Sequence, residues 1–79
     1  MKDAWPFQEP VDTKLVSDYT KIISEPMDFR TMRERLDKFY YKTKEMFYND
    51  FMLIVTNCRK YNDPSTTYCR CADTIEKQF

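Results

Sequence analysis

The longest regular pattern of apolar positions lies between Phe47 and Asn62. Apolar or aromatic side chains recur there every three or four residues, at Phe47, Phe51, Ile54, Val55, Cys58 and Tyr61. This spacing predicts an α-helix over residues 44–62 with one buried face. Asn62 takes the next position on that face, where an unpaired carboxamide costs about 1–3 kcal/mol. Asn62 therefore needs a hydrogen-bond partner, either the protein's own backbone or a ligand.

Two further helices are predicted on either side of this one. The first, at about residues 28–39, starts at Asp28 after Pro26, and its buried face is Phe29, Met32, Leu36 and Phe39 or Tyr40. The second, at residues 66–79, has the apolar positions Tyr68, Cys71, Ala72, Ile75 and Phe79. Residues 1–26 are predicted to form a long apolar loop, because three prolines interrupt any helical period. No strand pattern is present, so we expect one all-α domain over residues 1–79.

Composition narrows the possible functions. The 13 basic and 13 acidic residues cancel, so we expect no direct nucleic-acid binding. The apolar run from Phe51 to Val55 is too short to cross a membrane. The odd number of cysteines, three, favours reduced thiols over a secreted disulfide framework.

Catalysis and metal binding are not expected. The chain has no glycine for a phosphate-binding loop and no histidine, the commonest general base and metal ligand. Cys69 and Cys71, two apart on a helix, point about 200° away from one another and do not converge on an ion. We therefore expect no catalytic residue, no metal and no cofactor.

Three features are candidates for a binding site, and each has a structural alternative. The first is Asn62, whose amide is predicted to lie at the end of a cleft with aromatic walls, beside Tyr61, Cys58 and Tyr68. The structural alternative is that Asn62 only caps the helix. The run Trp5-Pro6-Phe7 is either a rigid shelf for a ligand or an apolar plug. Tyr19 either aims its hydroxyl at a ligand or packs in the core.

Taken in order, these motifs resemble a bromodomain. The residues that carry the resemblance are Trp5-Pro6-Phe7, Pro10-Val11, Asp18-Tyr19, Ile22-Ile23, Pro26-Met27-Asp28, Thr31-Met32, Leu36, Tyr41, Phe47, Asp50, Asn57-Cys58 and Tyr61-Asn62. They span nearly the whole chain. The spacing of Val11 and Tyr19 is similar to that of the group found in Gcn5-type acetyltransferases and nucleosome-remodelling factors. The resemblance implies a left-handed helical bundle, with the first helix largely absent from this chain.

The resemblance also implies a function: non-catalytic recognition of acetylated lysine, mostly on histone tails, in the nucleus and within a larger chromatin protein that regulates transcription. Asn62 would donate to the acetyl carbonyl, and Tyr19 would reach the same oxygen through a water. The slot would be completed by Pro6, Phe7, Val11, Val16, Cys58 and Tyr61, with Trp5 supporting the shelf and Tyr68 at the mouth. An unmodified ammonium would lose its hydration there, with no carboxylate in the predicted slot to meet it.

Two alternatives remain open. The chain could be a structural module that pairs with another chain through exposed apolar faces. It could also be the reader portion of a larger acetyltransferase or remodelling protein, in which case any catalytic activity lies outside these residues.

Overall fold

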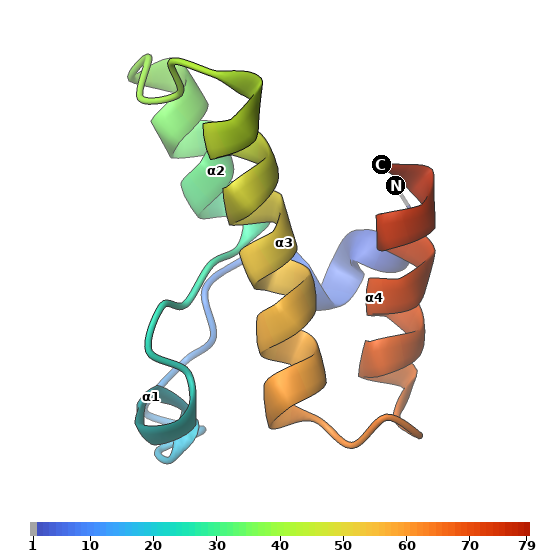
Figure 1. Cartoon of the computed structure of the whole chain (residues 1–79). Helices are drawn as coiled ribbons and strands as arrows, with labels where there is room; N and C mark the ends of the chain where they lie inside the picture. The colour runs from blue at the N-terminus through green and yellow to red at the C-terminus, as the bar shows by residue number, and fades with distance from the viewer. Residues whose placement is uncertain (1) are drawn as a thin grey trace.

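The computed structural model describes residues 2–79 as a short 3₁₀ helix and four α-helices (Figure 1). These elements are η1 (Lys2–Phe7), α1 (Tyr19–Ile22), α2 (Phe29–Asp37), α3 (Lys44–Tyr61) and α4 (Thr67–Gln78). The central helix is α3, because α4 packs along it, α2 contacts its first part and α1 lies beside its last turns. Packing of η1 against α4 completes the arrangement. No strand occurs within residues 2–79, which confirms the predicted all-α class.

Each of the three long helices begins just after a residue whose side chain caps it. Asp28 Oδ2 accepts from the backbone N–H of Thr31 at 2.9 Å and so caps α2. Thr43 caps α3 by accepting from the N–H of Met46 at 3.2 Å. Thr66 caps α4 in the same way. Each cap satisfies a backbone donor that the first helical turn leaves unpaired.

The prediction of a loop throughout residues 1–26 is wrong in two places. Within the described residues of this segment, η1 and α1 are helical. In η1, Ala4 and Phe7 are three residues apart, so they share one side of a 3₁₀ turn and both are buried. In α1, a single turn buries Tyr19 and leads to the buried Ile23. Burial of these few apolar side chains, and not a helical period, accounts for both elements.

Helix α2 ends earlier than predicted, at Asp37, because Phe39 adopts a left-handed backbone conformation with φ 57°. The backbone N–H of Tyr40 donates to the carbonyl of Arg35 at 2.9 Å, and that of Phe39 donates to Leu36 at 3.1 Å. This pair of bonds is the Schellman motif, which usually has glycine at the left-handed position. The predicted burial of Leu36 and of Phe39 or Tyr40 is also wrong, since these side chains are 51%, 79% and 46% exposed.

The core lies between α3, α4 and η1, with one contribution from α2. Its buried members are Ala4, Phe7, Met32, Phe51, Ile54, Val55, Cys58, Cys69, Cys71, Ala72 and Ile75. All three cysteines are free thiols in this core. Three of the four buried α4 residues, Cys69, Cys71 and Ala72, have small side chains.

A buried carboxylate joins α2 to α3. Asp50 Oδ2 accepts from Arg35 Nη1 and from the Tyr41 hydroxyl, both at 2.7 Å. Burial, reinforced by the Asp50 carboxylate, raises the pKa of Tyr41 well above its ordinary value, so the hydroxyl stays a donor. The network fixes the turn between the two helices and satisfies a charge that would otherwise be costly to bury.

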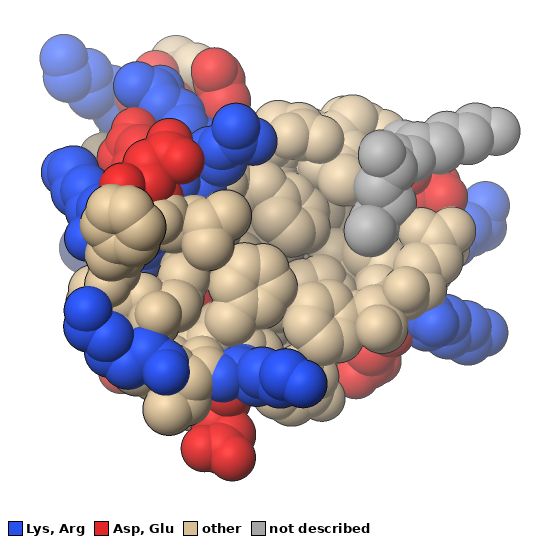
Figure 2. All heavy atoms as spheres, turned by 90° about the horizontal axis from the view of Figure 1, so that it is seen from above, with Lys and Arg blue, Asp and Glu red and all other residues tan. Residues whose placement is uncertain are grey.

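The end of the bundle nearest the start of α3 carries exposed aromatic surface. The Phe79 ring stacks on Phe51 at 4.3 Å between centroids and also contacts Phe47 and Tyr48, yet it is 57% exposed. Figure 2 shows this end as a largely uncharged surface, with charged side chains gathered at its edges.

Within residues 2–79, no helix is long and apolar enough to cross a membrane. The same residues contain no group of three or more potential metal ligands.

We expect Phe39→Gly to stabilise the fold by about 0.5–1 kcal/mol relative to Phe39→Ala. Both variants remove the exposed ring, but only glycine relieves the left-handed strain of a side chain with a Cβ atom. Urea denaturation of the two variants measures the difference. Equal stability of the glycine and alanine variants would contradict this account of the helix end.

Candidate functional site

A cavity of about 260 Å³ opens at the end of α3, between the loop that follows η1, α1 and the start of α4. Its lining is mostly apolar and comprises Pro6, Phe7, Glu9, Val11, Val16, Tyr19, Met27, Ile54, Cys58, Tyr61, Asn62 and Tyr68. All nine residues predicted to contact a ligand are in this set, so the structure brings them together around one space. Trp5 lies outside the lining, with its ring 5.9 Å from that of Tyr68.

Three lining residues were not predicted. Ile54 lies one helical turn before Cys58 on the same face of α3, so the apolar period contained a signal for it. Met27 belongs to the Pro26-Met27-Asp28 motif that carries the resemblance, but it was given no place in the slot. Glu9 belongs to no pattern. It also corrects the expectation that the slot has no carboxylate, because Glu9 is an exposed residue of the cavity lining.

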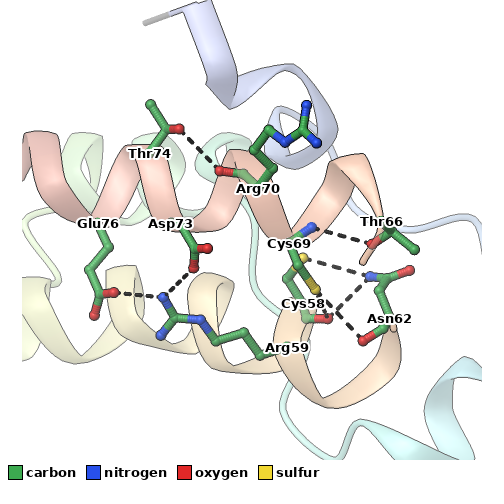
Figure 3. Close-up of polar contacts among 9 residues, drawn as sticks. All are labelled: Cys58, Arg59, Asn62, Thr66, Cys69, Arg70, Asp73, Thr74 and Glu76. Atoms are coloured by element: carbon green, nitrogen blue, oxygen red, sulfur yellow. Dashed lines mark hydrogen bonds and ion pairs between the residues drawn. The ribbon is translucent and has the colours of Figure 1, made fainter. Parts of the chain in front are cut away.

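Asn62 is the C-cap of α3, and its extended backbone turns the chain out of the helix. Its side-chain Nδ2 donates to the Cys58 carbonyl at 3.2 Å and lies 3.7 Å from the Cys58 sulfur (Figure 3). The protein's own backbone therefore supplies one partner for the amide. The other contact is with sulfur, which is a weak acceptor. Part of the donor capacity of Asn62 is left for a better acceptor in the cavity.

The base of the cavity beside Asn62 is uncharged. Burial raises the pKa of the Cys58 thiol to about 11, and the neighbouring Cys69 adds to the shift. Cys69 Sγ lies 3.8 Å from the Cys58 carbonyl and 3.7 Å from that of Asn62 (Figure 3). Because the Cys58 thiol stays protonated near neutral pH, it packs against the end of α3 without adding a charge.

Tyr19 and Tyr61 form the aromatic wall of the cavity. Their rings lie 4.9 Å apart, and the Tyr61 hydroxyl donates to Asp18 Oδ1 at 2.7 Å. This bond to the carboxylate raises the pKa of Tyr61. The two contacts attach α1 to the end of α3, although the bonded residues are 43 positions apart in the sequence.

The Tyr19 hydroxyl differs from that of Tyr61. Its oxygen has no hydrogen-bond partner among the described residues. Every fully buried side-chain oxygen in this part of the chain does have a partner, so the Tyr19 oxygen is not fully buried but open to the cavity. Burial of the ring raises the pKa of Tyr19, so the hydroxyl is neutral and can donate. A water or ligand atom in the cavity can therefore meet it.

Polar contacts outside the cavity hold its walls in place. Arg59 of α3 pairs with Asp73 at 2.8 Å and with Glu76 at 2.7 Å, which ties α3 to α4 (Figure 3). On the other side, Asn57 Nδ2 donates to the backbone carbonyl of Glu25 at 2.8 Å and so fixes the segment that leads into α2.

A sequence profile of the bromodomain family matches residues 1–74. The chain belongs to the bromodomain family. It is 46% identical over 78 residues to the histone acetyltransferase GCN5 of Oryza sativa subsp. japonica, covering 98% of this chain and 15% of that protein. GCN5 of Yarrowia lipolytica is 47% identical over 74 residues, covering 94% of this chain and 16% of that relative. The resemblance to the Gcn5-type group is thereby confirmed.

A third relative, the nucleosome-remodeling factor subunit NURF301 of Drosophila melanogaster, is 42% identical over 78 residues, covering 99% of this chain and 3% of that protein. The bromodomain chain thus spans no more than 16% of the length of any of these three relatives. Bromodomains are non-catalytic modules that recognise acetylated lysine, and the cavity at the end of α3 is the candidate site for that recognition.

We expect Tyr61→Phe to loosen α1 without unfolding the bundle. The variant keeps the ring contact with Tyr19 but loses the bond to Asp18, so the α1 amides should exchange with solvent about threefold faster. Hydrogen exchange measured residue by residue tests this, with Tyr48→Phe at the opposite end of α3 as the control. Unchanged exchange in α1 would show that the ring contact alone holds it.

Proposed function

We propose that this bromodomain recognises acetylated lysine, on histone tails or other acetylated proteins, by holding the acetylated side chain in the cavity beside Asn62. The observation that carries this proposal is the pairing of one incompletely used amide donor with a mostly apolar lining. An acetylated lysine matches both features, since it has an apolar four-carbon stem and a single carbonyl acceptor at its end.

The hydrogen bond proposed for Asn62 follows from its present contacts. The amide already donates to the Cys58 carbonyl, which fixes its orientation. A ligand carbonyl would take the hydrogen that now faces only the Cys58 sulfur. Replacing a sulfur contact by an N–H···O bond is favourable, and the Cys58 carbonyl keeps the amide in place when no ligand is bound.

Tyr19 is proposed to act on the same oxygen through a water molecule. Its hydroxyl opens to the cavity without a protein partner in the described residues, while its ring is held by Tyr61. A bridging water is nearly as good enthalpically as a direct hydrogen bond, but its immobilisation offsets part of the gain. The contribution of Tyr19 to affinity should therefore be smaller than that of Asn62.

Selection against unmodified lysine is proposed to arise from desolvation. An ammonium entering the cavity would lose water against Val11, Val16 and neutral tyrosines, at a cost of several kcal/mol. Glu9 does not remove this penalty, because its carboxylate is exposed and its charge is screened by solvent. The cavity of about 260 Å³ is slightly below the roughly 300 Å³ of small ligand pockets, so we expect weak binding of one side chain.

The setting of this function is proposed from the relatives. GCN5 is a histone acetyltransferase and NURF301 is a subunit of a nucleosome-remodeling factor. We infer that this bromodomain acts in the nucleus within a chromatin protein that regulates transcription. It contributes recognition there, without chemistry of its own.

We expect Asn62→Ala to weaken binding of singly acetylated histone-tail peptides by about tenfold or more, because the ligand carbonyl loses its direct donor. Isothermal titration with acetylated peptides and their unmodified counterparts measures the effect, and circular dichroism checks that helicity is retained. Asn49→Ala, an exposed position on α3, is the matched control. Unchanged affinity of a folded Asn62→Ala variant would refute the proposed site.

We expect Tyr19→Phe to lower the affinity for the same peptides by about two- to fivefold, less than Asn62→Ala does, because only the water-mediated contact is lost. The ring contact with Tyr61 remains, so stability should change little. The same titrations measure the difference. If Tyr19→Phe binds as tightly as the unaltered protein, the tyrosine is structural.

A further inference from the structure

We propose that Glu9 selects acetylated peptides that carry a cationic residue, arginine above all, within two positions of the acetylated lysine. This inference rests on the proposed function, because it concerns what the same cavity admits beside the acetyl group. Glu9 is the one charged side chain among the residues that line the cavity.

Glu9 lies on the boundary between two concave surfaces. One is the cavity beside Asn62, and the other is an open groove of about 550 Å³ between the loop after η1, α2 and the start of α3. Its carboxylate makes no ion pair with any side chain that the structure describes, and it is exposed. A charge placed at the cavity without an internal partner is available to whatever enters.

The chemistry of the ligand determines which group can use this charge. Acetylation removes the positive charge of lysine, so the side chain inside the cavity has nothing to offer a carboxylate. The complementary charge must therefore come from a neighbouring residue of the same peptide. Successive residues of an extended peptide are about 3.3 Å apart, so a residue one or two positions away stays at the cavity mouth.

Arginine fits this position better than lysine. Its planar guanidinium can donate two parallel hydrogen bonds to a carboxylate, and it loses less conformational freedom for each bond formed. Asp18 does not line the cavity, and its Oδ1 accepts from the Tyr61 hydroxyl. Glu9 lines the cavity, and both of its carboxylate oxygens are open to a ligand donor. A pair exposed to solvent changes affinity only modestly, by about two- to fivefold, and salt weakens it.

The test compares two synthetic peptides that contain one acetyl-lysine and differ only in an arginine or a glutamine, scanned over the two positions on either side. The unaltered protein should bind the best arginine peptide about three- to fivefold more tightly at about 50 mM salt, and this preference should fade at about 500 mM. Glu9→Gln should bind both peptides alike. Glu9→Lys should favour a peptide with glutamate at that position.

Glu45→Gln provides the matched control, since it removes the same charge in the first turn of α3. It lies seventeen positions before Asn62 along α3, about 25 Å at 1.5 Å per residue, which is well beyond the screening length. It should keep the preference for arginine.

The outcomes separate this inference from the function it builds on. If the acetylated peptides bind but arginine gives no advantage, or the advantage persists in Glu9→Gln, the role of Glu9 is refuted and acetyl-lysine recognition stands. A Glu9→Gln variant that binds both peptides less tightly, and by the same factor, also refutes the proposed role, because Glu9 then contacts the part of the ligand that the two peptides share. If neither peptide binds the unaltered protein, the proposed function itself fails.

Discussion

The way α3 ends at Asn62 governs both the packing of this small bundle and the shape of its cavity. The Asn62 side chain folds back onto the Cys58 carbonyl, and the Cys69 thiol approaches the same carbonyl from α4. The chain then turns through Asp63 and Pro64 and restarts at the Thr66 cap. The Cys58 carbonyl also accepts from the backbone N–H of Asn62 at 2.9 Å. This one carbonyl thus closes the last turn of α3, joins α3 to α4 and orients the amide that we propose for ligand binding.

The elements with strong local signals were predictable. Regular apolar spacing located α3 and α4, and the cap Asp28 located the start of α2. The two short helices in the first 26 residues were not, because four to six residues cannot display a helical period. The exposure of Leu36 could not be read from α2 alone, since periodicity gives the face of a helix and not what covers it.

The candidate site was only partly accessible to reasoning from periodicity. That reasoning suggested a cleft around Asn62, Tyr61 and Tyr68, but it left open whether the amide served the backbone or a ligand. The resemblance to bromodomains supplied the loop residues Val11 and Val16, which lie far from Asn62 in the sequence. Glu9 was missed by both routes, because a single acidic residue in a loop has no distinctive spacing.

The left-handed Phe39 at the end of α2 has a wider consequence in a chain that contains no glycine. Glycine broadens the unfolded ensemble, and each glycine replaced at a permissive position lowers the entropy lost on folding by about 0.4–1 kcal/mol. Seventy-nine residues can bury only a modest apolar surface to offset that loss. The strain at Phe39 is thus offset by an unfolded chain that has fewer conformations to lose on folding. The absence of glycine also stiffens the loops that form the cavity, before any ligand binds.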